Sequence, residues 1–575
     1  MNTSDRGIRL GSVAQFRVAV LLVTALAAVS PSTRGQLSPT TRVSVDSSGA
    51  EANDMTSMAW IAGDGRAVAF QSAATNLVPN DANGIWDVFV HDRTTGVTDC
   101  VSVDPNGVPG DLGGGDWSLP PSPPSISADG RFVVFLSYST NLVAGQKGKR
   151  GQLYVRDRAT GTTDFVSVDD SGTQGNADSQ FGTISADGQF VAFQSTSTNL
   201  VAGDTNQHMD VFVRDRAAGS TERISVGASG TQGDDDSSHP LLSADGTTVA
   251  FGSLATNLVA NDTNGRSDAF VCDLATNTLE RISVDPSGVE GDSDSIPSSI
   301  SADGRYVAIW SLATNLVPGD TNGASDCFVR DRATGITERV SVDSSGGESD
   351  DDSFGPFLSA DGRFVAFVSC ATNLVPSDAN GTWDVFVHDR TTGSTTRVNL
   401  GVAGAEADDW SDLPTISADG SVVSFVSAAT NLVTGDSNSG SDAFTYDLHH
   451  ASWTNYGVGF PGTNGVPALT SRAAPVLGTS ITLDVQNSSG QPTIGLLIAG
   501  FQRASLHTSR GGDLLVLPAY VLPITFSYGS NQFAWTIPTD PTLAGAILDL
   551  QAVEADPGAA KGVSFTAGLE LVVGL

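Results

Sequence analysis

The sequence predicts an all-β protein: a seven-bladed β-propeller closed by its own N-terminal strand, with a C-terminal β-sandwich-like domain. Three observations support this fold class. A tetrapeptide recurs seven times at nearly constant spacing, each period holds four strand-like runs, and the two ends of the array complete each other. From about Trp453 the repeat stops, so a separate domain is expected there.

The repeat is marked by the tetrapeptide Thr-Asn-Leu-Val. Successive copies are 65 residues apart once and then 58 residues apart five times. The long interval contains a glycine triplet and a Pro-rich stretch within 113–124, which indicates a loop insertion of seven residues. A fixed period of this kind is typical of repeat architectures. The copies begin at Thr75, Thr140, Thr198, Thr256, Thr314, Thr372 and Thr430.

One period contains four strand-like runs. A short run ends at Ser359, Ala360-Asp361-Gly362 predicts a turn, and 363–368 is almost continuously apolar, as expected for a strand covered on both faces. Two further runs, 384–389 and 395–400, are separated by a second turn. Four antiparallel strands in a repeat that closes into a ring make a propeller blade.

The ends of the array distinguish a ring from an open stack. Residues 41–45 match the fourth run of a repeat, and the last repeat stops after its third run, at 442–447. In a ring these two segments pair and remove an exposed strand edge. The predicted domains are therefore a propeller over 38–451 and a β-rich domain over 453–575.

The motif Ser-Ala-Asp-Gly-Arg-Phe-Val-Ala-Phe at 359–367, followed by Asp-Val-Phe-Val-His-Asp at 384–389, resembles the WD40-like repeat of TolB-type propellers. The resemblance covers about 40–450 and implies the propeller fold. Such propellers serve as docking platforms, lyases and peptidase gates, so no single activity is implied.

This chain departs from the TolB pattern: Ala replaces the usual Pro, the period is longer, and the N-terminal domain is missing. The region after 453 resembles β-rich modules of large secreted bacterial proteins, which implies surface retention or carbohydrate contact.

Residues 1–30 have the layout of a secretory signal peptide. Three arginines precede an apolar run from Val18 to Val29, and small residues follow. The run is too short to cross a bilayer, although a retained anchor is the alternative. We therefore expect a secreted, periplasmic or cell-surface protein without a membrane span after cleavage.

The net charge of −35 arises from few Lys and Arg rather than from dense charge, since 16% of residues are charged. Nucleic acid is disfavoured as a partner because the sequence has no basic stripe. The four cysteines each stand where other repeats have Arg, Val or Leu, so no shared disulfide framework is indicated: Cys100, Cys272, Cys327 and Cys370.

The loop between the second and third runs carries the pattern Asp-x-Asn-x-x-x-Asp. Short Asp and Asn side chains at alternate loop positions are the usual oxygen ligands of calcium. The sequence therefore predicts calcium as a cofactor, with about three side-chain ligands from each loop. The candidate metal ligands are Asp81, Asn83, Asp87, Asp204, Asn206, Asp210, Asp262, Asn264, Asp268, Asp320, Asn322, Asp326, Asp378, Asn380, Asp384, Asp436, Asn438 and Asp442.

A second acidic set lies in the link from the fourth run to the next blade, and topology places it on the same face. The second repeat is an internal control: its loop has lost the acidic trio and carries Lys147, Lys149 and Arg150. The alternative is that Asp and Asn only cap turns, with no metal. The recurring link residues are Asn176, Asp234, Asp292, Asp350 and Asp408.

No catalytic constellation is recognised. The sequence therefore favours a binding or scaffold protein, expected to be monomeric, that presents an acidic, calcium-binding propeller face to an unknown protein or glycan. Two alternatives stay open: a polysaccharide lyase or glycosidase on the same scaffold, and a structural cell-surface protein.

Overall fold

The computed structural model is all-β. It describes residues 40–573 except 80, 82, 113–121, 147–149, 377, 402–403, 439, 449–451, 457–458, 472–474, 476–479, 501–502, 509–512, 517, 519, 527–529, 538–546 and 561. This part of the chain contains no α-helix and one short 3-10 turn, Ala228–Gly230. Packing divides the chain into two compact units, one of which spans Ser38–Asp447.

The described part of the first unit contains seven four-stranded antiparallel sheets, numbered here as blades 1 to 7 in chain order. Blades 1 to 3 are β2 (Thr56–Ile61), β3 (Ala67–Ser72), β4 (Asp87–Asp92), β5 (Val97–Cys100); β6 (Ser125–Ile126), β7 (Phe132–Ser137), β8 (Gln152–Asp157), β9 (Thr162–Phe165); and β10 (Ser179–Ile184), β11 (Phe190–Ser195), β12 (Asp210–Asp215), β13 (Ser220–Arg223).

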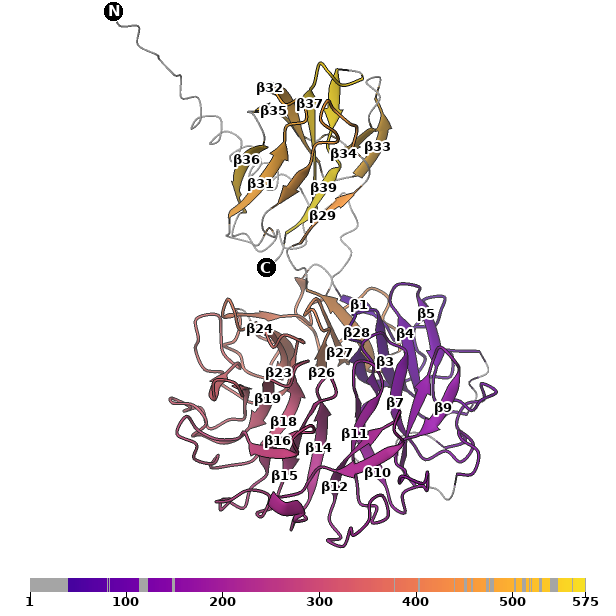
Figure 1. The fold of residues 1–575 in the computed structure, drawn as a ribbon. Helices are drawn as coiled ribbons and strands as arrows, with labels where there is room; N and C mark the ends of the chain where they lie inside the picture. The colour runs from indigo at the N-terminus through magenta and orange to yellow at the C-terminus, as the bar shows by residue number, and fades with distance from the viewer. Residues whose placement is uncertain are drawn as a thin grey trace, which may run out of the picture. The chain divides into compact units, whose positions relative to one another are not determined.

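Blades 4 to 7 follow the same order, except that the last one takes its fourth strand from the N-terminal side (Figure 1). They are β14 (Ser237–Leu242), β15 (Thr248–Ser253), β16 (Asp268–Asp273), β17 (Thr278–Arg281); β18 (Ser295–Ile300), β19 (Tyr306–Ser311), β20 (Asp326–Asp331), β21 (Ile336–Arg339); β22 (Ser353–Leu358), β23 (Phe364–Ser369), β24 (Asp384–Asp389), β25 (Ser394–Arg397); and β26 (Ser411–Ile416), β27 (Val422–Ser427), β28 (Asp442–Asp447), β1 (Thr40–Arg42).

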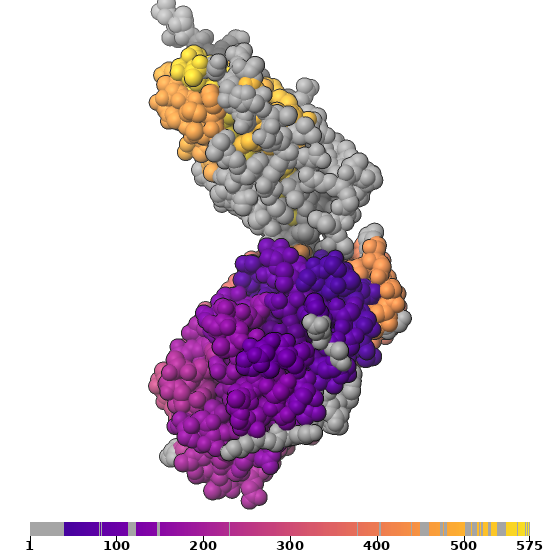
Figure 2. Space-filling model, turned by 90° about the vertical axis from the view of Figure 1, so that its right-hand side faces the viewer, coloured from indigo at the N-terminus to yellow at the C-terminus, as the bar shows by residue number. Residues whose placement is uncertain are grey.

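The middle strands of each blade form its core. In blade 6, the side chains of Phe367 and Phe386 are fully buried, and their rings stack 5.7 Å apart across β23 and β24. Both strands are nearly continuous apolar runs because neighbouring blades cover both faces. The same aromatic pairing recurs in other blades, for example between Phe70 and Phe89 in blade 1. The outer surface of the first unit runs from indigo to magenta in Figure 2.

The ring closes through β1. Its three residues pair antiparallel with β28, with Thr40 opposite Tyr446 and Arg42 opposite Phe444 (Figure 1). Blade 1 in turn packs against blade 7, because β2 contacts β26, β27 and β28. The propeller fold and its closure by the N-terminal strand are therefore confirmed.

A belt of backbone hydrogen bonds links the Ala-Asp-Gly turns around the channel. The turns meet closely: a Cβ added at Gly63 would lie 3.0 Å from the Cβ of Ala128 and 3.6 Å from that of Ala418. Proline has no N–H to donate, which explains why alanine stands in these turns. The bonds run Asp64 N→Ala128 O, Ala128 N→Ala186 O, Ala186 N→Ala244 O, Asp245 N→Ala302 O, Ala302 N→Ala360 O, Ala360 N→Ala418 O and Ala418 N→Gly63 O.

The Thr-Asn-Leu-Val tetrapeptide fixes each link at the opposite end of the channel. The carboxylate of Asp350 accepts both the backbone N–H and the hydroxyl of Thr372, at 2.7 and 2.8 Å, while Leu374 is buried. The second acidic set thus caps this turn. The equivalent pairs are Asn53–Thr75, Asp111–Thr140, Asn176–Thr198, Asp234–Thr256, Asp292–Thr314 and Asp408–Thr430.

The second unit includes Leu448–Leu575. Within its described part, a six-stranded sheet and a three-stranded sheet share one apolar core that contains Ile481, Leu497 and Leu550. Its strands are β29 (Ser452–Tyr456), β30 (Leu469–Ser471), β31 (Ser480–Gln486), β32 (Thr493–Gly500), β33 (Arg503–His507), β34 (Asp513–Val516), β35 (Tyr520–Phe526), β36 (Ser530–Thr536), β37 (Ile547–Ala555), β38 (Val563–Phe565) and β39 (Gly568–Val572).

Within the described residues, the structure has no helix that is both long and apolar enough to span a membrane. The predicted signal peptide, residues 1–30, lies outside the described part of the chain.

Candidate functional site

The predicted metal ligands do come together, one Asp-Asn-Asp cluster in each of six loops. The Asn is the centre of the cluster's hydrogen bonds: in blade 5, Asn322 Nδ2 donates to Asp326 at 3.1 Å and to the carbonyl of Ser349 at 3.0 Å. Its Oδ1 accepts the backbone N–H of Ala324 at 2.9 Å, which makes an Asx turn. Asn83, Asn206, Asn264, Asn380 and Asn438 make the same bond to the second Asp.

The second Asp of each cluster is fully or almost fully buried. Its Oδ1 accepts a hydrogen bond from the side chain that begins the next link, as Asp268 does from Ser283 at 2.6 Å. A buried carboxylate needs such partners, because desolvation raises its free energy. The equivalent pairs are Asp87–Ser102, Asp210–Ser225, Asp326–Ser341, Asp384–Asn399 and Asp442–Ser44.

Five of the six clusters already contain a cation of the protein's own. In blade 6, the guanidinium of Arg397 lies 3.3 Å from Asp378, 3.0 Å from Asp384 and 2.6 Å from Glu406. The arginine side chains are 8–11% exposed, so these ion pairs are largely shielded from water. The other four are Arg42 with Asp436 and Asp442, Arg223 with Asp204 and Asp210, Arg281 with Asp262 and Asp268, and Arg339 with Asp320 and Asp326.

The pKa values within one cluster move in opposite directions. Burial, together with the neighbouring Asp326, raises the pKa of Asp320 to about 6, although Arg339 opposes the shift. Burial also acts to raise the pKa of Glu348, but hydrogen bonds from Thr321 and the charge of Arg339 outweigh it and lower that pKa to about 2. Arg339 is therefore shared between two carboxylates, of which Glu348 is well paired and Asp320 is poorly paired.

Blade 2 lost its arginine along with its carboxylates. Gln152 stands in place of the second Asp and accepts the Ser167 hydroxyl at 2.7 Å, and Phe165 stands in place of the arginine. Lys147 and Lys149 of the same loop lie outside the described residues. The joint loss of both charges indicates that arginine and carboxylates are one unit.

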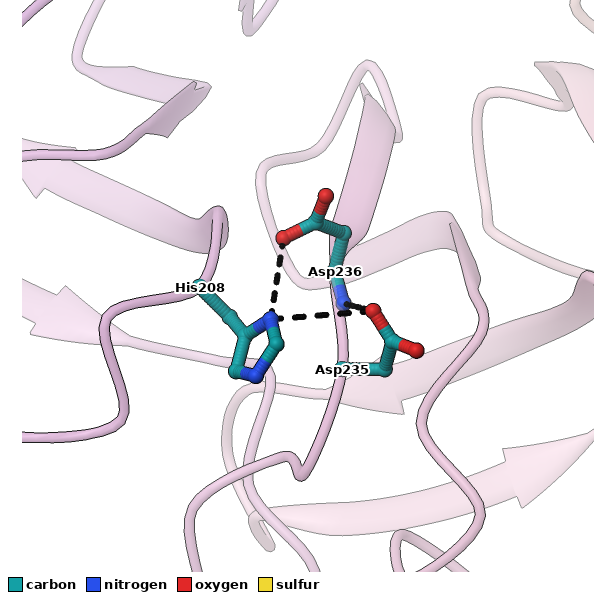
Figure 3. A group of neighbouring side chains, drawn as sticks. All are labelled: His208, Asp235 and Asp236. Carbon is teal, nitrogen blue, oxygen red and sulfur yellow. Dashed lines mark hydrogen bonds and ion pairs between the residues drawn. The ribbon is translucent and has the colours of Figure 1, made fainter.

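One further acidic group lies on the surface, between the β11–β12 loop of blade 3 and the link from blade 3 to blade 4. His208 Nδ1 is 3.6 Å from Asp235 and 3.3 Å from Asp236 (Figure 3). All three side chains are at least one-third exposed, and Asp236 also accepts the backbone N–H of Met209 at 2.8 Å. This arrangement is a surface ion pair on a turn cap.

The central channel holds a feature that sequence reasoning missed. The first strand of most blades is interrupted by a β-bulge, for example between Phe354 and Phe357 in β22. The bulge residue has a left-handed backbone, with φ of 53° at Met58, 51° at Phe181, 55° at His239 and 54° at Leu413. Non-glycine residues adopt this conformation at a cost of about 1–3 kcal/mol, and such strain clusters at functional sites. Gly355 in blade 6 has the same left-handed backbone, with φ of 58°. Blades 2 and 5 have Pro123 and Pro297 at this position, and the ring of proline does not allow a positive φ.

These bulges line a pocket of about 590 Å³. Its wall is mainly apolar and aromatic, with Met58, Phe181 and Leu413 from the bulges and Trp383 from the β23–β24 loop. Two aromatic contacts order the wall. The ring centroids of Phe354 and Trp383 are 5.2 Å apart. Trp60 and Phe357 pack edge to face, with their ring centroids 5.0 Å apart. Pockets of this volume are typical of small-molecule sites.

Asp412 is the one carboxylate among the described residues that line this pocket. It accepts the backbone N–H of Leu413 at 2.6 Å, and burial raises its pKa. The signal for this site was present in the sequence: the six-residue segments at 56–61, 179–184 and 353–358 differ from each other, whereas the strands that follow them are nearly identical.

No family model and no curated protein sequence matches the chain. Similar solved structures include a protein described as TolB from Agrobacterium tumefaciens, with 16% identity over 57% of this chain and 89% of that chain at a TM-score of 0.32.

The WD40 repeats of RRP9 are 9% identical over 68% of this chain and 94% of that chain, with a TM-score of 0.34. A GH74 enzyme from Niastella koreensis is 10% identical over 92% of this chain and 67% of that chain, with a TM-score of 0.38. The propeller assignment rests on the strand pairing, and these likenesses carry no conclusion about function.

Proposed function

We propose that the chain is a binding protein whose ligand lies in the central channel pocket. One observation carries this proposal: in five of the seven blades the bulge residue keeps a left-handed backbone, while the residue itself changes among Met, Phe, His, Gly and Leu. A strained position that is retained without a fixed side chain is suited to shaping an asymmetric pocket on a symmetric scaffold.

The chemistry of the wall favours a small organic cation with an apolar body. Aromatic faces such as those of Trp60 and Trp383 attract ammonium groups, and the carboxylate of Asp412 adds an opposite charge. Asp412 is half-buried and its pKa is raised by partial desolvation, so a bound cation would stabilise its charged form. The net charge of −35 also favours the approach of cations.

Binding accounts for these residues better than hydrolysis of a glycan does. Glycoside hydrolysis ordinarily uses two carboxyl groups that flank the bond to be cleaved. Asp412 has no second carboxylate beside it among the described pocket residues. The mostly apolar wall also offers few hydrogen-bond partners for sugar hydroxyls.

The test compares choline with 3,3-dimethylbutan-1-ol, its uncharged carbon isostere, by tryptophan fluorescence and calorimetry on the full chain. We expect choline to bind at least about tenfold more tightly, which corresponds to about 1.4 kcal/mol. Asp412→Asn should remove this preference, whereas Asp99→Asn, which changes an exposed carboxylate on β5, should keep it. Equal binding of the two probes would refute the cation class, as would a neutral oligosaccharide that binds where choline does not.

A further inference from the structure

The arginine position separates the seven blades into three kinds. Five Asp-Asn-Asp clusters contain an arginine, and blade 2 has neither arginine nor carboxylates. Blade 1 alone keeps the Asp-Asn-Asp cluster, as Asp81, Asn83 and Asp87, but has Cys100 where five other blades have arginine. Pro109 also replaces the glutamate or glutamine of the next link, so blade 1 has no glutamate to compensate.

Both carboxylates of blade 1 are buried. Asp81 is 6% exposed and Asp87 is 2% exposed. Asp87 has its usual partners, because its Oδ1 accepts the Ser102 hydroxyl at 2.6 Å and its Oδ2 accepts Asn83 Nδ2 at 2.6 Å. These are neutral donors, so they satisfy the oxygen atoms without balancing the charge.

Asp81 lacks a partner for one oxygen. Its carboxylate accepts the backbone N–H of Asn83, but Oδ1 is buried with no hydrogen-bond partner in the described structure. No ion pair between the described residues reaches Asp81 or Asp87. Cys100 cannot replace the arginine, because a thiol is neutral or negatively charged and supplies no positive charge.

Two buried carboxylates without a countercharge are strongly unfavourable unless they are protonated or bind a cation. The other five Asp-Asn-Asp clusters meet this requirement with a largely buried arginine. The missing charge corresponds to the guanidinium that the other blades supply.

We propose that blade 1 binds one calcium ion through Asp81 and Asp87, in the position that arginine occupies in five other blades. The donors are carboxylate oxygens, which suit calcium, and nearby loop carbonyls and water would complete the six to eight oxygens that it takes. The other clusters bind no calcium in this proposal, and the inference is independent of the channel ligand.

The test is calcium titration of the full chain by calorimetry, with thermal unfolding in chelator and in about 1 mM calcium. We expect one ion per chain with a dissociation constant of about 0.1 mM, in the range of weak extracellular sites, and a melting temperature higher by about 2 °C with calcium. A stoichiometry of five or six would show that the arginine does not exclude calcium, and zero would show that blade 1 does not bind it.

Three variants sharpen the result. Cys100→Arg supplies the absent guanidinium and should abolish calcium binding, while Cys100→Ala removes the thiol without adding charge and should retain it. Asp81→Asn should also abolish calcium binding. This variant still tests the proposal if the arginine introduced by Cys100→Arg prevents folding. Calcium binding retained by Asp81→Asn would overturn the proposal, and an equal response to magnesium would overturn the assignment of calcium.

Discussion

The Asp-Asn-Asp clusters and the channel bulges occupy equivalent positions in the same ring, yet they vary in opposite ways. The clusters repeat both backbone and side chains, and five of them bury an arginine among the same carboxylates. Five of the bulges repeat the left-handed backbone conformation but present different residues, from Met58 to Leu413. The comparison teaches that side chains repeated in every unit of an array can serve the common structure. A position that keeps its backbone conformation but varies its side chain can instead serve selective binding.

The largest expected effect tests whether the clusters are structural. Arg281→Met should lower the free energy of unfolding by about 3–5 kcal/mol, because it leaves Asp262, Asp268 and Glu290 buried without their cation. Urea denaturation of the full chain measures the loss. The matched control is Arg266→Met in the same blade. The Arg266 side chain is 54% exposed, so this substitution should lower the free energy of unfolding by less than about 0.5 kcal/mol. Similar losses in both variants would remove the distinction between cluster and surface.

A smaller effect should appear in the pH dependence of stability. The folded-state pKa of Asp320 is raised to about 6 from an ordinary value of 3.8. Its contribution to the free energy of unfolding is therefore fully present below about pH 4, where the side chain is protonated, and is lost as pH rises through 6. Asp320→Asn cannot titrate, so it should gain stability relative to the natural protein between pH 4 and 7. The gain is at most about 3 kcal/mol for a shift of this size. A difference that is constant over this range would contradict the raised pKa.

The smallest expected effect concerns a bulge. Leu413 is 39% exposed with φ of 54°, so Leu413→Gly should relieve backbone strain while losing little packing. We expect stability to change by less than about 1 kcal/mol, in the stabilising direction, with weaker binding in the channel. The matched variant is Gly355→Ala, which places a side chain at φ of 58° and should destabilise. A large loss in Leu413→Gly would make the bulge a packing element instead.

Much of the ring could be predicted from sequence because a 58-residue period leaves few other solutions. The pairing of residues 41–45 with the last repeat followed from the complementary ends, and β1 does pair with β28. The clustering of Asp320, Asn322 and Asp326 also followed from spacing, since the three lie in one loop.

The role of arginine could not be predicted in the same way. Arg339 lies 13 residues after Asp326, and the two meet because β20 and β21 pair in a particular register. The channel site was missed for a different reason. A glycine in the sequence can indicate a left-handed backbone. Met58 and Phe181 give no such indication, because the surrounding bulge imposes their conformation.

The belt of hydrogen bonds between the Ala-Asp-Gly turns has a consequence for unfolding. In a linear repeat protein the outermost unit has one neighbour, so unfolding can begin there and spread. In this ring every turn is bonded on two sides, from Ala128 through Ala418 to Gly63, so the array has no outermost unit. Opening one blade breaks contacts with two others, and the first unit should therefore lose its structure in one cooperative transition.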